Sequence, residues 1–225
     1  MVMDFFRGGG QSTIEEVEET LVEMMQNAQV VYEEAMGAVF GGGKSKETKK
    51  HVKKTDKEIN IAQQEVRRAL VMHASVSPTT DIADTLAYMS VVKDVERVGD
   101  YSKNVYDLAK FGTDFTGAAD IDVLADYRDK VAQLMEDAAT VFAARDEEGA
   151  QALINKADVF LDEYDDHVRT AFNSTGPASE AVARALYYRF LKRITAHVMN
   201  LMTALVAPID RLDYYDEAKE DRVDG

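Results

Sequence analysis

The chain repeats one pattern of apolar spacing, and this repeat constrains the fold more than any other feature of the sequence. Apolar residues recur at alternating steps of three and four along three long stretches in each half of the 225 residues. This spacing places them on one face of an α-helix, and that face should be buried. The clearest stripe consists of Tyr88, Val91, Val95, Val98, Ser102, Val105 and Ala109.

The stripes of the two halves correspond at a constant offset within each helix. In the first helix, Val17, Leu21, Met24, Ala28 and Val31 match Tyr127, Val131, Leu134, Ala138 and Val141. In the second helix, Val52, Ile59 and Val66 match Ile154, Leu161 and Val168. In the third helix, Val91, Val95, Val98, Ser102, Val105 and Ala109 match Tyr187, Leu191, Ile194, Val198, Leu201 and Leu205. The sequence therefore predicts an all-α fold, a tandem pair of antiparallel three-helix bundles with an internal pseudo-twofold repeat, at residues 12–111 and 119–217.

Local residues mark the helix boundaries. Ser12 precedes Glu15 by three positions, which is a capping-box pattern at the start of a helix. The glycines at 41–43 end that helix, and the second helix is expected from about residue 45 to 75. Pro78 and Pro177 each separate the second and third helices of their half. Within the third helix, Gly99 lies close to the apolar stripe, where a missing side chain lets a neighbouring helix approach.

Composition excludes several classes of protein. The 26 basic and 41 acidic side chains leave a net charge of −15, which repels phosphate backbones and argues against nucleic-acid binding. Without cysteine there is no disulfide, thiol catalysis or thiolate metal site. No run of about 20 apolar residues predicts a membrane span, and the N-terminus has no signal-peptide pattern, so a cytoplasmic protein is expected.

Acidic residues form a second row on the third helix of the first half. At about 100° per residue, Glu96 and Asp100 point away from the apolar stripe, one turn apart. Asp56 and Asn60 form a similar pair on the preceding helix, and the two pairs together present oxygen ligands suited to a hard metal or iron. The alternative is a solvated acidic face with lysines and Arg97 nearby.

The second half keeps only part of this polar pattern. Lys192 stands where Glu96 stands in the first half, and Ala196 stands in place of Asp100. The acidic pair of the third helix is therefore lost there.

The sequence contains two other groups of side chains that could make contacts. The second helix begins with a run of lysines that has no counterpart in the second half, and this run is interpreted as a solvated end or as a contact for an acidic partner or a membrane surface. The run consists of Lys44, Lys46, Lys49, Lys50, Lys53, Lys54 and Lys57. The four histidines share no repeat position and are interpreted as surface or partner contacts rather than ligands; they are His51, His73, His167 and His197.

Several motifs resemble those of one family. The stretch VVKDVERVGDYSKNVYDLA, residues 91–109, resembles the third-helix signature of the PhoU family of phosphate-signalling and phosphate-transport regulators. TDKEINIAQQEV, residues 55–66, resembles its second-helix signature. LKRITAHVMN and KADVFLDEYDD are weaker second copies, so the resemblance extends from about Ile14 to Asp216.

The resemblance implies a cytoplasmic, six-helix, homodimeric protein that binds phosphate transporter components and a sensor histidine kinase. It would contact the membrane only through these partners and would bind no nucleic acid. Some members carry iron or another divalent metal on paired acidic motifs. Carried over by position, the metal ligands are Asp56, Asn60, Glu96, Asp100, Asp158 and Asp162. Asn60, Lys192 and Ala196 depart from the motif, so a full second metal cluster is not expected.

The sequence therefore predicts a non-enzymatic regulator of phosphate uptake and phosphate-starvation signalling. Within the same resemblance, the alternative is an accessory subunit of a sodium-coupled or low-affinity phosphate transporter. From another class, the alternative is a carboxylate-bridged metalloenzyme. No Gly-rich phosphate loop, nucleophile elbow or Glu-x-x-His pair supports catalysis.

Overall fold

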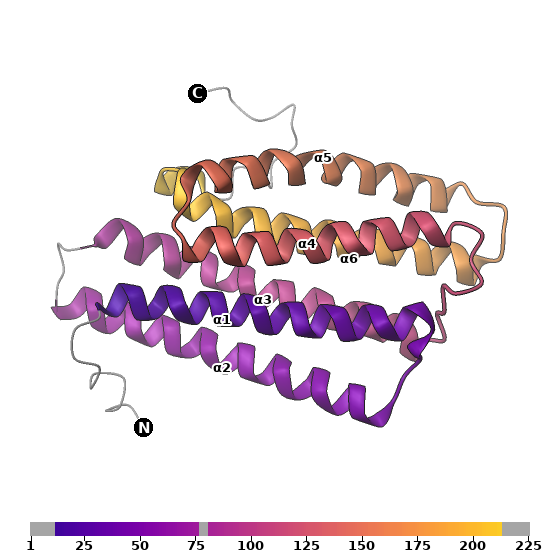
Figure 1. The fold of residues 1–225 in the computed structure, drawn as a ribbon, viewed down its shortest axis with the longest axis horizontal. Helices are drawn as coiled ribbons and strands as arrows, with labels where there is room; N and C mark the ends of the chain where they lie inside the picture. The colour runs from indigo at the N-terminus through magenta and orange to yellow at the C-terminus, as the bar shows by residue number, and fades with distance from the viewer. Residues whose placement is uncertain (1–11, 77–80, 213–225) are drawn as a thin grey trace.

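The computed structural model describes residues 12–76 and 81–212, and these ranges contain six long helices and no strand (Figure 1). The helices are α1 (Thr13–Gly37), α2 (Lys46–Val76), α3 (Ile82–Lys110), α4 (Ile121–Ala143), α5 (Glu147–Phe172) and α6 (Ala178–Val206). A π-helical turn, Ala38–Gly42, follows α1, and a 3-10 turn, Ile209–Arg211, follows α6. The prediction of an all-α helical-bundle fold is confirmed.

The helix ends follow the local sequence. Ser12 caps α1, and both hydrogen bonds of the predicted capping box with Glu15 are present. Gly41 and Gly43 have positive φ angles, so the turn between α1 and α2 uses a backbone conformation that glycine adopts without strain. Pro78, predicted to separate the second and third helices, lies outside the described residues. Pro177 immediately precedes α6, as predicted.

The helices are arranged as two sets of three. Helices α1, α2 and α3 contact one another, and so do α4, α5 and α6. Helix α2 lies along the lower edge of the molecule in Figure 1 and α5 along the upper edge, while α3 and α6 lie between them. The division into domains 12–111 and 119–217 stays a prediction, because extensive contacts between α3 and α6 and between α1 and α4 join the two sets.

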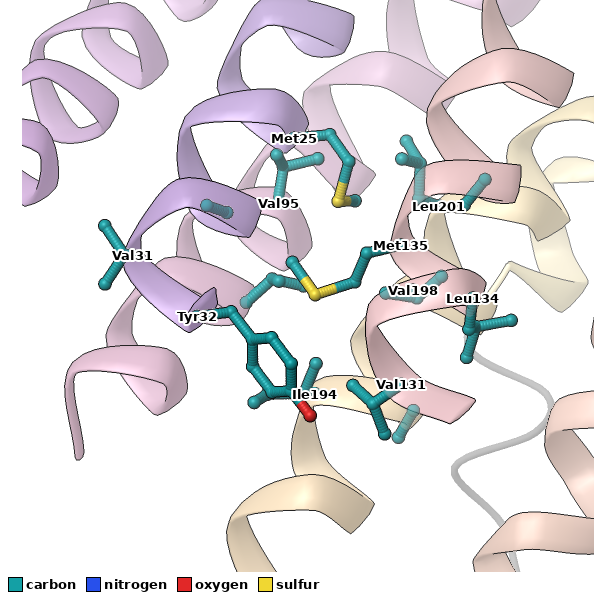
Figure 2. Packing of buried hydrophobic residues seen from close by; sticks show 14 of the residues in the cluster. Met25, Val31, Tyr32, Val95, Val131, Leu134, Met135, Ile194, Val198 and Leu201 are labelled. Carbon is teal, nitrogen blue, oxygen red and sulfur yellow. The ribbon is translucent and has the colours of Figure 1, made fainter. Parts of the chain in front are cut away.

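One continuous hydrophobic core extends through all six helices. The predicted stripe of α3 is buried along its whole length. Figure 2 shows the part of the core where the two sets meet: Met135 of α4 extends toward Met25 and Tyr32 of α1, with Val198 of α6 beside it. The buried stripes of both halves therefore pack into the same interior.

Gly99 lets α2 and α3 approach each other closely. A Cβ atom added at Gly99 would lie 2.9 Å from Cδ1 of Ile59 on α2, which is closer than side chains normally pack. The lower helix propensity of glycine is thus offset by the close contact of two helices.

Candidate functional site

The predicted acidic residues of the first half meet at the contact between α2 and α3. The ammonium group of Lys103 lies between Asp56 of α2 and Asp100 of α3 and donates hydrogen bonds of 2.6 and 2.8 Å to their carboxylates. Arg97 lies 3.6 Å from Asp100 and 3.8 Å from Glu96. This cluster of Asp56, Glu96 and Asp100 with Lys103 is called the α2–α3 acidic cluster below.

The charges of this cluster interact across a partly buried surface. Burial raises the pKa of the Glu96 carboxyl, and the negative charge of Asp100 raises it further. The pKa of Lys103 is also raised: burial lowers it, but hydrogen bonds and charge attraction from Asp100 and Asp56 outweigh that effect. Asn60 donates its side-chain amide to the backbone carbonyl of Asp56, at 2.8 Å.

The other two predicted ligands lie elsewhere. Asp158 and Asp162 are on α5, at the opposite edge of the molecule from α2 (Figure 1). Lys192, which replaces the glutamate in the second half, pairs with Asp165 of α5. In each half a lysine of the third helix thus bonds an aspartate of the second helix, although the two lysines do not occupy equivalent repeat positions.

These residues do not, as placed, form a metal centre. Over residues 12–76 and 81–212, no three His, Asp or Glu side chains are grouped closely enough to hold a metal ion. Between Asp56 and Asp100 the structure places the positive charge of Lys103, where a cation would otherwise sit. A metal ion would have to displace this ammonium group, and metal binding at these six residues stays a prediction.

A second polar group lies between the two sets of helices, and its acidic member was not predicted from the sequence. Asp94 of α3 is fully buried and faces α6. Its carboxylate accepts a hydrogen bond from Asn200 at 3.0 Å and from Lys93 at 2.9 Å, and it lies 2.8 Å from Nδ1 of His197. The ring of His197 stacks on Tyr101 with centroids 5.6 Å apart. This α3–α6 polar group joins the two sets at the centre of the molecule.

The balance of effects at Asp94 favours its ionised form. Burial raises the pKa of the carboxyl, but hydrogen bonds from His197, Asn200 and Lys93 outweigh burial and lower the pKa below its ordinary value. Asp94 is therefore a buried carboxylate with its partners in place.

The histidines do not behave as free surface residues. His51 pairs with Glu34, His167 stacks on Tyr188 with centroids 4.3 Å apart, and His197 pairs with Asp94. His73 is largely buried, 3.6 Å from Asp81. The interpretation of all four as surface or partner contacts does not fit His73 and His197, because their side chains are only 10% and 15% exposed.

Polar contacts also join the sets at two further places. Arg145, in the loop between α4 and α5, donates to Glu18 of α1 at 3.0 Å, and Tyr88 of α3 donates to the same carboxylate. Tyr32 of α1 donates its hydroxyl to the backbone carbonyl of Arg128 on α4, at 2.9 Å. These contacts fix the angle between the sets without offering an open site.

One family model matches most of the first half of the chain. The family model described as the PhoU domain matches residues 21–109, which contain most of α1, all of α2 and nearly all of α3. This match confirms the resemblance to the PhoU family. A search of curated protein sequences found no significant match.

Solved structures match the fold over both halves. The crystal structure of PhoU from Pseudomonas aeruginosa matches with a TM-score of 0.74 and 18% identity, covering 89% of this chain and 96% of that chain. The crystal structure of the phosphate transport system regulatory protein PhoU from Streptococcus pneumoniae matches with a TM-score of 0.73 and 16% identity, covering 94% and 97%. At these identities the matches show a shared six-helix fold.

Within the described ranges, no helix combines the length and the apolar composition that crossing a bilayer requires.

Proposed function

We propose that this protein, whose residues 21–109 form a PhoU domain, regulates phosphate uptake and phosphate-starvation signalling by binding other proteins. The family match carries the proposal, and the fold shared with the phosphate transport system regulatory protein PhoU from Streptococcus pneumoniae supports it. The partners would be phosphate transporter components and a sensor histidine kinase, met in the cytoplasm by a homodimer of this chain. Regulation of this kind needs docking surfaces rather than a catalytic centre.

The proposal is tested by recovering partners from cells. In phosphate-replete cells, a tagged copy of the full chain should co-purify with a phosphate transporter component or the sensor kinase. A deletion strain should show phosphate-starvation responses despite ample phosphate. If neither partner is recovered and the starvation response is unchanged, the regulatory proposal fails.

An accessory subunit of a sodium-coupled phosphate transporter is the second candidate. Such a subunit would contain the same PhoU domain, so the domain match fits both functions equally. The purification described above separates the two functions by the partner that it recovers. Recovery of a single permease without the kinase, together with changed phosphate uptake and unchanged starvation signalling, would favour this candidate.

Metal is proposed only as an aid, in competition with Lys103. Changing Lys103→Met leaves Asp56, Glu96 and Asp100 without the cation that lies between two of them. Because neighbouring carboxylates repel one another and a cation offsets this, we expect the variant to bind Mn²⁺ or Zn²⁺ about tenfold more tightly than the parent. Metal content after equilibrium dialysis measures this.

Two variants control this experiment. Lys110→Met removes a lysine that pairs with an aspartate three residues earlier on the same helix, without contact to α2, and should leave metal binding unchanged. Adding Glu96→Ala and Asp100→Ala to Lys103→Met should abolish the gain. If Lys103→Met takes up none of iron, zinc, manganese or nickel, a metal role at this cluster is ruled out.

A further inference from the structure

The first three turns of α2 present a face made of lysine. Lys46, Lys49, Lys50, Lys53 and Lys57 are exposed and fall within one arc of the helix. Val52, Thr55 and Ile59 of the same turns are buried against the rest of the molecule, on the opposite side. The lysine face therefore points away from the core along about 16 Å of helix, at the lower edge of Figure 1.

Within residues 12–76 and 81–212 these lysines have no acidic partners, although the chain has an excess of acids. Among the described residues, Lys54 alone of the seven at 44–57 makes an ion pair, with Glu58 at 3.3 Å. Every described lysine elsewhere pairs with an aspartate: Lys93, Lys103, Lys110, Lys130, Lys156 and Lys192. In a chain of net charge −15, six lysines in one segment without an ion pair to the described residues concentrate positive charge at one place. An anionic partner would supply the negative charge that the described residues do not place beside these lysines.

Exposed aromatic residues occur at the end of the molecule where α2 begins. Phe111 at the end of α3 is 84% exposed, and Phe172 at the end of α5 is 82% exposed. The ends of α3 and α5 and the start of α2 all lie at the right of Figure 1. Tyr106, in the last turns of α3, donates its hydroxyl to the backbone carbonyl of Ser45 at 3.3 Å, which joins the end of α3 to the start of the lysine segment.

We propose that the lysine face of α2 docks on the surface of an anionic membrane, with Phe111 entering the headgroup layer beside it. Lysines near an anionic bilayer each contribute about 1 kcal/mol without specific geometry, which suits a row of flexible ammonium groups that contains no arginine. Protein interfaces, in contrast, are depleted in lysine and enriched in arginine. The negative charge of the remaining surface would hold the molecule in one orientation on the bilayer.

This inference rests on the proposed function, because that function places the protein beside a membrane transporter. It differs from the expectation that membrane contact arises only through partners, since it assigns a direct contact to this chain. Its failure is distinguishable from failure of the regulatory proposal, because vesicle binding is measured with the purified chain alone.

The experiment is sedimentation of the full chain with vesicles of phosphatidylglycerol and phosphatidylcholine, or of phosphatidylcholine alone. We expect binding to the anionic vesicles only, and loss of that binding in about 0.5 M NaCl. The double variant Lys49→Gln with Lys53→Gln should bind about 25-fold more weakly, at about fivefold per lysine. The control Lys130→Gln with Lys156→Gln changes the net charge equally but removes paired lysines, and should bind as the parent does.

A third variant distinguishes binding to a membrane from binding to a soluble polyanion. Phe111→Ser should weaken binding to anionic vesicles while leaving retention on polyglutamate or heparin unchanged, because only a bilayer accepts the phenyl ring. Equal binding of the parent to both kinds of vesicle, or undiminished binding of Lys49→Gln with Lys53→Gln, would overturn the proposal. Retention on polyglutamate or heparin without binding to anionic vesicles would also overturn it, in favour of an acidic macromolecule.

Discussion

Changing Asp94→Ala is expected to lower the free energy of unfolding by about 3 kcal/mol. The substitution removes a fully buried carboxylate and its contacts with the amide of Asn200 and the ring of His197. The loss of several buried hydrogen bonds at once accounts for the size of the effect. Urea unfolding at neutral pH, followed by circular dichroism, measures it.

A matched control lies on the same helix. Asp107 pairs with Lys110 at the surface, so Asp107→Ala should change the free energy of unfolding by no more than about 0.5 kcal/mol. A loss below about 1 kcal/mol for Asp94→Ala would show that the α3–α6 polar group is not needed to hold the two sets of helices together.

The effect of Asp94 should also depend on pH. Because its pKa is lowered in the folded protein, its contribution to stability is complete above the unfolded value of about 3.9 and is lost as the pH falls through the lower folded value. The difference in unfolding free energy between parent and Asp94→Ala should therefore shrink only in acid, below about pH 4. A difference that changed between pH 6 and 8 would contradict this expectation, because a carboxyl group with a lowered pKa does not titrate there.

The apolar core could be predicted from the sequence because its periodicity is strict. The stripe of α1, from Ile14 through Val31, is fully buried as expected, and so are Val52, Ile59 and Val66 on α2. The agreement is weaker near the C-terminal ends of the helices in the second half, where Val141, Val168 and Leu205 are only half-buried. Helix ends have fewer neighbours, so the same spacing buries less surface there.

Asp94 was missed because a stripe predicts one buried face and α3 has two. Gly99, next to the predicted stripe, faces Ile59 of α2 and the neighbouring α1, while Asp94 faces α6 and is buried as well. The second buried face of α3 is covered by α6, which is about 100 residues away in the sequence. The residues of this second face do not recur in α3 at a regular helical spacing. A carboxylate between apolar residues was the only available sign, and by itself it resembles an exposed charge.

The acidic row was predicted correctly in its direction but not in its surroundings. Glu96 and Asp100 do point away from the apolar stripe, yet their side chains are only 15% and 28% exposed because α2 packs beside them. Lysines were expected near the acidic row, but the bond of Lys103 to Asp56 crosses between helices. Such contacts depend on the rotation of one helix against another, which spacing along a single helix does not specify.

Changing Met135→Ala is expected to destabilise both sets of helices together, by about 2 to 5 kcal/mol. Met135 is fully buried on α4 and extends toward Tyr32 and Met25 of α1 across the contact between the sets (Figure 2). Truncation leaves a cavity that belongs to both sets. Since one core extends through all six helices, urea unfolding of the variant should remain a single transition with an unchanged slope against denaturant.

Hydrogen exchange shows whether the loss is shared. Helices α2 and α5 lie at opposite edges of the molecule, and neither carries Met135. If all six helices unfold as one unit, amide protection in α2 and in α5 should fall by the same free energy. Val123→Ala, which truncates an exposed side chain on α4, should change neither helix by more than about 0.5 kcal/mol. Reduced protection in α5 with unchanged protection in α2 would mean that residues 12–111 and 119–217 unfold independently, because a cavity in a separate bundle cannot loosen a helix of the other.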